Sequence, residues 1–406
     1  LESRAYYSEL LVPVFAKTSA EGWARGLELQ LAARRDENTI TTRSNIGGIV
    51  VPNPNGPFPS VEYVERKFSA TKATLGLKYS PIRDITLRAN WGTGFLIPPL
   101  SQLGTGNSVT GVFTGVDPKR GNVSASPSVT SITGGNPNLK PEESESVSAG
   151  VILTPRFLRG LRVSIDYTRI QKTDEIAFLT NQQRLDFEDR LPGVIVRAPL
   201  TPADQARGYT GGIITQVDSR SMNIAGKRLA AYDIQVDYTL ATSSWGEFQA
   251  YAIATYQPDF SNKVFVDLDY VQLVGTADQL RWRGNGGLTW TKGPLSLGWN
   301  MQYYDSYLVY SATSSPATIA NQVLNQGSST IPSQIYHDIQ FRYQWGTMAH
   351  GWKGLLSNTQ LTLGVQNVFN TRPPVVATTQ VGAPGGYSYF GDPRLARYTI
   401  SLRKKF

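Results

Sequence analysis

Amphipathic strands joined by connections of alternating length constrain the fold of this chain more than any other feature. In residues 85–91, apolar residues alternate with the polar Thr86, Arg88 and Asn90. This two-residue period is typical of a strand with one apolar and one polar face. The pattern recurs along the chain, and Gly- and Pro-rich segments separate the strands. Short turns are expected near residues 81–84, 243–246 and 292–294, and long connections at residues 36–67, 94–142 and 173–211.

This alternation predicts an all-β fold, a transmembrane antiparallel β-barrel with tight turns at one end and long loops at the other. The 20 Tyr and 8 Trp residues of the sequence gather near strand ends, as in the aromatic girdles of such barrels. Hydrocarbon leaves no partner for an open backbone amide, so a membrane sheet must close on itself. A soluble sandwich is the competing fold, but it does not require connections that alternate in length.

The number and direction of the strands add a further expectation. About 13 crossings can be counted, with residues 213–240 taken as one extended strand, and the first and last crossings run in the same direction. Complete single-chain bacterial barrels have even strand numbers and both termini on the periplasmic side. Residues 1–406 are therefore expected to be the C-terminal portion of one barrel domain. The remaining strands would belong to another chain or to sequence not included here.

The last strand has the pattern expected of a barrel seal. Tyr398, Ile400, Leu402 and Phe406 fall on one face, and basic and hydroxyl residues fall on the other. The chain ends on an aromatic residue, as many barrel-closing strands do. We expect this strand to seal against the first strand of the complete barrel.

The composition argues against several other functions. Cys is absent and only two His are present, which removes thiol chemistry and leaves little for a metal centre. We therefore expect no enzymatic activity and no cofactor. The net charge of +8 is spread along strands and turns and forms no basic arm, so a nucleic-acid partner is not expected. An anionic membrane surface is the favoured partner for this charge.

A set of polar and aromatic residues is predicted to face the barrel lumen or a ligand. On the strands these residues either line a solvated wall that holds a plug, or bind cargo. Aromatic residues of the loops are candidates for stacking on a chelate or a sugar. The set comprises Arg88, Asn90, Arg162, Asp166, Tyr209, Asp233, Asp237, Arg281, Arg283, Tyr304, Tyr307 and Arg342.

Four stretches resemble TonB-dependent outer-membrane receptors. Residues 87–100 are similar to the arginine-led strand of that family and the Gly-Phe-x-x-Pro loop start that follows it. Residues 135–144 are similar to its Gly-Asn-Pro-x-Leu-x-Pro-Glu loop exit. Residues 367–370 and 397–406 are similar to its penultimate and closing strands. The four stretches occur in family order along the whole chain.

The resemblance implies a barrel of about 22 strands with an N-terminal plug, of which about nine strands and the plug are absent here. It also implies an energy-coupled importer of a large, scarce nutrient, such as an iron chelate or a saccharide. A structural barrel of the same family that anchors an outer-membrane complex is the alternative. A passive porin would lack the four stretches.

The expected location is the bacterial outer membrane, with short turns and the C-terminus periplasmic and long loops extracellular. The expected partners are outer-membrane lipid and lipopolysaccharide, the missing strands and plug, the TonB complex and the barrel-assembly machinery.

Overall fold

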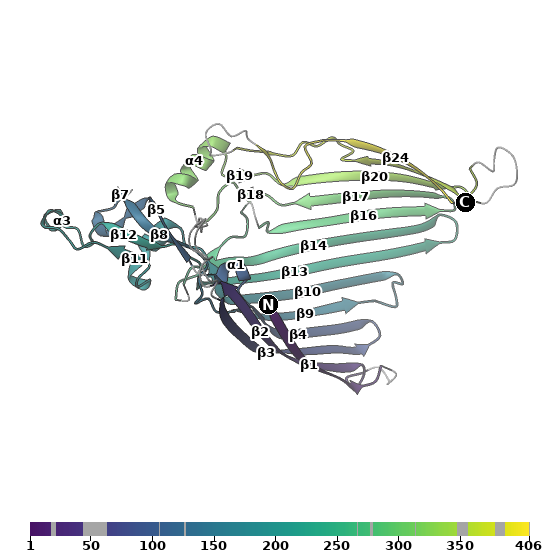
Figure 1. Ribbon diagram of the computed structural model, residues 1–406. Coiled ribbons are helices and arrows are strands. Elements are labelled where there is room, and N and C mark those ends of the chain that lie inside the picture. The colour runs from purple at the N-terminus through teal and green to yellow at the C-terminus, as the bar shows by residue number, and fades with distance from the viewer. Residues whose placement is uncertain are drawn as a thin grey trace, which may run out of the picture.

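A computed structural model describes residues 1–17, 22–43, 63–104, 106–125, 127–265, 267–276, 279–312, 314–346, 356–377 and 386–405. Its main feature is one large antiparallel sheet that curves as part of a barrel wall (Figure 1). In the described residues, thirteen strands form a continuous path through this sheet, and the short β15 (Val271–Gln272) pairs beside β14. The path is β1 (Glu2–Phe15), β2 (Leu27–Arg43), β3 (Tyr63–Ile82), β4 (Ile85–Leu96), β9 (Glu142–Leu153), β10 (Leu161–Ala177), β13 (Met222–Thr242), β14 (Gly246–Lys263), β16 (Trp282–Lys292), β17 (Leu295–Tyr304), β20 (Gln334–Gln344), β21 (Thr359–Gln366) and β24 (Arg397–Lys404).

The described residues confirm the expected count of about 13 strands and the shared direction of the first and last strands. Every neighbouring pair on the path is antiparallel, so β1 and β24 run in the same direction. The two strands form opposite edges of the sheet (Figure 1). In the part of the chain that the structure describes, β24 pairs on one side only, with β21. Tyr398, Ile400 and Leu402 share one exposed face of β24, and Phe406 lies outside the described residues.

Two expected boundaries were wrong. Residues 213–240 do not form one strand, because β12 (Ile214–Asp218) belongs to a separate small sheet and only β13 joins the large one. The expected long loop at residues 36–67 is shorter, because β2 and β3 remain paired from Leu27↔Tyr79 to Arg43↔Tyr63. The paired ends of β2 and β3 are rich in polar residues, so they lack the alternation of apolar and polar residues that predicts a strand.

One face of the sheet is apolar, and the described residues do not cover it. A row in register runs from Leu288 through Trp299 and Ile339 to Val365, and the first three of these side chains are each about 40% exposed. A continuous exposed apolar surface of this extent is not stable against water, and it requires lipid or protein beside it. In the described residues, no helix is both long enough and apolar enough to cross a membrane.

Aromatic rings mark both margins of this apolar face. Tyr167, Tyr232, Tyr256 and Trp282 form a row over four adjacent strands, with successive ring centroids 4.9, 6.1 and 4.6 Å apart. Trp290 lies eight residues beyond Trp282 on β16, a distance of about 26 Å along a strand. Strand tilt reduces this to about 20 Å, close to the height of the apolar band of a membrane barrel.

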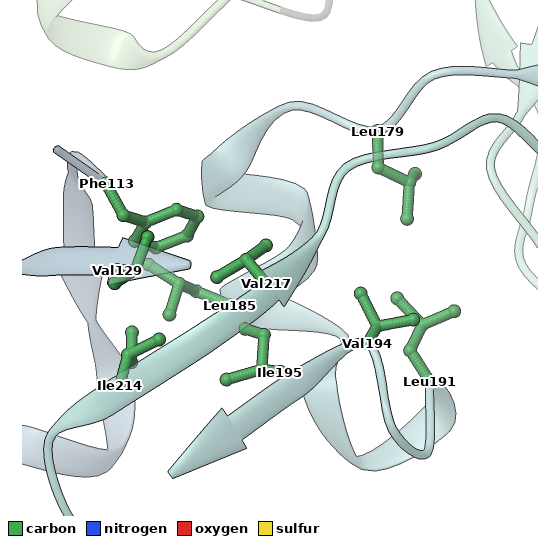
Figure 2. Packing of buried hydrophobic residues seen from close by; sticks show 9 residues of the cluster. All are labelled: Phe113, Val129, Leu179, Leu185, Leu191, Val194, Ile195, Ile214 and Val217. Atoms are coloured by element: carbon green, nitrogen blue, oxygen red, sulfur yellow. The ribbon is translucent and has the colours of Figure 1, made fainter. Parts of the chain in front are cut away.

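Two long loops fold together beyond one end of the large sheet (Figure 1). We call residues 104–135 and 178–221 the two-loop module. Its four-stranded sheet has the order β11-β12-β8-β5, and its buried core contains residues from both loops (Figure 2). Its elements are β5 (Gly106–Val112), β6 (Gly115–Asp117), η1 (Pro118–Arg120), β7 (Val123–Ala125), β8 (Ser128–Gly134), α2 (Asn181–Asp186), η2 (Glu188–Arg190), β11 (Ile195–Arg197), α3 (Pro202–Ala206) and β12, and α1 (Leu100–Leu103) precedes it.

The remaining connections carry short elements. These are β18 (Tyr307–Leu308), α4 (Pro316–Gln326), β19 (Thr330–Ile331), β22 (Val375–Val376) and β23 (Gly386–Tyr387). Ser315 caps α4 by accepting a hydrogen bond from Thr318 N, and Gly327 ends the helix at a φ of 73°. Leu280, Tyr307 and Ile331 form a small buried cluster beneath these connections.

Candidate functional site

A row of charged and polar side chains crosses the polar face of the sheet. The register places Arg88 opposite Gly150, Gly150 opposite Asp166, and Asp166 opposite Asp233. The row continues from Asp233 through Thr255 to Arg283. Six adjacent strands therefore contribute to one line, in which the acidic pair Asp166 and Asp233 lies between Arg88 and Arg283, on the face opposite the aromatic row.

Arg88 and Asp166 form an ion pair that spans the strand between them. Arg88 Nε lies 2.7 Å from Asp166 Oδ1, although the two residues are separated by β9. Gly150 makes this possible, because a Cβ at that position would lie 1.9 Å from Asp166 Oδ1. Arg88 is consequently neutralised at the wall and is not free to bind an anion.

The other predicted acids on this face are also held by neighbours. Arg162 Nη1 lies 3.4 Å from Asp237 Oδ2, and the Gln235 amide donates to the same carboxylate at 2.8 Å. Asp233 accepts a hydrogen bond from the Thr255 hydroxyl at 2.7 Å. Asn90 lines the hollow beside Arg88 and Asp166. The wall is thus a hydrogen-bonded polar surface, and Asp233 has no cationic partner among the described residues.

A second hollow on the same face combines a guanidinium with an aromatic ring. It is lined by Ile253, Thr255, Arg283, Asn285, Gln302 and Tyr304. Arg283 and Tyr304 are directly opposed in the register of β16 and β17. Arg283 is exposed and makes no ion pair with a described residue. The Tyr304 ring stacks on Phe390, with centroids 5.2 Å apart. A cation beside stacked rings is suited to a bulky anionic or aromatic ligand.

The other predicted site residues lie elsewhere. Tyr209 belongs to the two-loop module, where the Arg120 guanidinium lies 4.6 Å from its ring. Arg342 lies on β20 near the short-turn end and donates to Gln340 at 3.3 Å. Arg281 precedes β16 and is exposed. Tyr307 does not fit a ligand-facing role, because it is 3% exposed and its hydroxyl donates to Ser388 at 3.1 Å within a buried cluster.

The Gly-Asn-Pro stretch at residues 135–142 ties three strand ends together at the long-loop end. The Asn136 amide donates to Ser221 O at 2.8 Å. Lys140 N donates to the Asn223 side chain at 2.8 Å, and that side chain donates to both Lys140 O and Asp174 O. The Glu142 carboxylate accepts from Ile176 N at 2.8 Å. We call these contacts the rim knot. They give the residues of this stretch a structural role that requires no ligand.

A buried ion cluster in the two-loop module was not anticipated from the sequence. Arg197 pairs with Asp117 and Glu188, and Asp117 is fully buried. Burial alone would lower the pKa of Arg197, but hydrogen bonds and charge from Glu188 and Asp117 outweigh it and raise that pKa. Eighty residues separate Asp117 from Arg197, so no local spacing indicates the pair.

Comparison with solved structures finds the same fold at low sequence identity. The siderophore receptor PirA of Acinetobacter baumannii superimposes with a TM-score of 0.54 at 15% identity, over 94% of this chain and 47% of that one. A ferric enterobactin receptor (PfeA) variant of Pseudomonas aeruginosa, in complex with enterobactin, gives 0.54 at 14% identity, over 98% and 54%. The ferric-catecholate import receptor Fiu of E. coli K12 gives 0.51 at 13% identity, over 93% and 42%.

This chain therefore spans about half the length of the receptors it resembles. No match is found among curated protein sequences. The family described as TonB dependent receptor-like, beta-barrel, matches residues 3–368. The uncovered apolar face, the aromatic row and the antiparallel path of strands agree with that match, and the chain belongs to the TonB-dependent receptor β-barrel family.

Proposed function

We propose that this chain is the C-terminal part of the barrel of an energy-coupled outer-membrane importer. Its cargo would be a large, scarce nutrient, with an iron chelate as the first candidate. The solved receptors of the same fold are described as siderophore, ferric enterobactin and ferric-catecholate import receptors. A plug and a TonB-coupling segment would come from a part of the protein beyond these residues.

The hollow around Arg283 and Tyr304 is the observation that carries this proposal. Arg88 and Arg162 are neutralised by Asp166 and Asp237, whereas Arg283 has no carboxylate partner among the described residues. A guanidinium that is not committed to the wall is available for charge-assisted hydrogen bonds to an anionic ligand. Tyr304, whose ring packs on Phe390, adds an aromatic surface to the same hollow.

The direction of the edge strands limits how the barrel closes. Direct pairing of β1 with β24 would be parallel, whereas every neighbouring pair on the path is antiparallel. All-antiparallel closure therefore needs an odd number of additional strands, and about nine would complete a 22-stranded barrel. In this arrangement the short turns and β24 end are periplasmic and the two-loop module is extracellular.

The apolar and polar faces of the sheet would have different neighbours in the complete protein. Outer-membrane lipid would cover the apolar face, and the aromatic row would lie at the interface with lipopolysaccharide head groups. The missing plug would occupy the polar face, where Asp233 offers it a carboxylate. The TonB complex and the barrel-assembly machinery remain proposed partners of the whole protein.

Replacement of Arg283 tests the cargo site in the full-length protein. We expect Arg283→Ala to weaken binding of a ferric tris-catecholate chelate by about 10- to 100-fold, because hydrogen bonds to charged groups contribute about 1.5–3 kcal/mol each. Titration of the purified receptor with the chelate measures this loss. Arg403→Ala, which removes an exposed arginine at the short-turn end of β24, serves as the matched control and should retain full affinity.

Equal affinity in Arg283→Ala and the control would remove Arg283 from the cargo site. Uptake assays on a strain that lacks the protein address the function itself. Unchanged uptake of every nutrient tested would favour the structural role over import.

A further inference from the structure

The two-loop module is joined across its two loops as well as within each of them. Strand β8 of the first loop pairs in parallel with β12 of the second, through Thr130↔Gln216, Ser131↔Val217 and Ile132↔Asp218. The pairing continues where Ser219 N donates to Ile132 O at 2.8 Å. These bonds close a sheet whose two halves are contributed by loops that follow different hairpins.

The core of the module is shared in the same way. Phe113 and Val129 of the first loop pack with residues of the second, and both are 3% exposed (Figure 2). Their partners from the second loop are Leu179, Leu185, Leu191, Val194, Ile195, Ile214 and Val217. Separation of the loops would expose this cluster to water, at about 25 cal/mol for each Å² of apolar surface.

Arg197 is the strongest polar connection between the loops. Its Nη1 and Nη2 lie 2.8 and 3.0 Å from the two oxygens of Asp117 in the first loop. Its Nε and Nη2 also donate to Glu188 in the second loop, at 2.9 and 2.7 Å. The Arg197 side chain is 10% exposed and that of Asp117 is 0% exposed, so loss of Arg197 would leave the Asp117 carboxylate buried without a cation.

Further contacts across the loops surround this cluster. Lys119 of the first loop lies 2.6 Å from Asp189 of the second, and Arg120 lies 2.8 Å from Asp204. The Gln182 side chain both accepts from Val116 N and donates to Val116 O, at 2.9 Å each. Polar contacts across the loops therefore occur at several points around the Arg197 cluster.

From these connections we propose that residues 104–135 and 178–221 open and close as one cooperative body, with Arg197 as the residue that couples the two loops. A ligand or partner that touches only one loop then displaces the other as well. The inference concerns the loops themselves and holds whether or not the protein imports cargo. It extends the proposed function by assigning a mechanical role to a buried ion cluster.

Hydrogen exchange in the intact, membrane-reconstituted protein without cargo tests this coupling. We expect amides of β8 and β12 to share one opening rate. We expect Arg197→Met to accelerate both sets by on the order of 100-fold, because it leaves Asp117 buried without its partner. Amides of β16 in the main sheet should not change. Arg207→Met, at an exposed arginine of the same module, is the matched control and should leave all rates unchanged.

A double variant distinguishes loss of the Arg197–Asp117 pair from other ways in which Arg197→Met could destabilise the module. We expect Asp117→Asn combined with Arg197→Met to accelerate exchange less than the product of the two single effects. Acceleration confined to β11 and β12, with β8 unchanged, would overturn the proposal. Multiplicative single effects would overturn the role of the Arg197–Asp117 pair. Both outcomes are independent of whether chelate binding is found at Arg283.

Discussion

Val236→Arg is expected to destabilise the folded barrel by about 2–4 kcal/mol, because it places a guanidinium in the hydrocarbon layer. Val236 lies on the apolar face of β13, opposite Val163 of β10 and Ala252 of β14. It is four residues from Tyr232, a member of the aromatic row, and therefore lies well inside the apolar band. Denaturant unfolding of the full-length protein from lipid vesicles measures this change in free energy.

Gln235→Arg is the matched control, because the adjacent residue points to the opposite face of the same strand. Gln235 already donates to Asp237 at 2.8 Å, and on its face of β13 it lies between Asp233 and Asp237. We expect its unfolding free energy to change by less than about 0.5 kcal/mol, as is usual for a tolerated exposed substitution. Equal losses in the two variants would contradict the assignment of the faces.

The sequence predicted the main sheet because two-residue periodicity is a local signal. The alternation in residues 85–91 identifies β4 directly. The turn at residues 81–84 predicts its pairing with β3, and the turn at residues 292–294 predicts the pairing of β16 with β17. The count of thirteen crossings and the shared direction of the first and last strands followed from the same local pattern. Strand ends were less predictable, since β2 continues to Arg43 through polar residues that pair without an apolar stripe.

The two-loop module was not predicted, because its stability depends on contacts between distant segments. Residues 94–142 and 173–211 resemble long loops when each is considered separately, yet β8 and β12 pair in parallel across them. Aromatic residues of the loops were candidates for ligand stacking, but the loop residue Phe113 is 3% exposed in the module core. The face of a strand residue can be assigned from its parity, but the environment of a loop residue depends on what the loop packs against.

The same reasoning distinguishes two groups among the candidate site residues of the polar face. Arg88, Asp166 and Asp237 are on the predicted face but serve the wall, since each has an ion-pair partner. Arg283 and Tyr304 are on that face and line an open hollow, so they are the candidates for binding cargo. Periodicity alone cannot make this distinction, because partners such as Arg88 and Asp166 are 78 residues apart.

Gly135→Ala is the second prediction with a large expected effect, and it tests the rim knot. A Cβ at Gly135 would lie 2.3 Å from Gly104 O and 2.6 Å from Gly104 N, so a backbone segment must move to admit it. Gly104 is the first residue of the two-loop module, and Gly135 adjoins Asn136, whose amide donates to Ser221 O. We expect a loss of about 3 kcal/mol in local stability, at the upper end of overpacking costs.

Gly111→Ala is the control, because a Cβ there meets nothing within 4 Å and the residue belongs to the same module. Hydrogen exchange at the long-loop ends of β9, β10 and β13 is the measurement, since the rim knot joins these three strands. Faster exchange at all three ends in Gly135→Ala, with none in Gly111→Ala, is the expected result. Faster exchange at β9 alone would show that Asn136 and Asn223 do not connect the strand ends. In that case Gly135 would shape only its own loop. If the rim knot joins the three strand ends, Gly135 also positions the backbone where the two-loop module meets β9, β10 and β13.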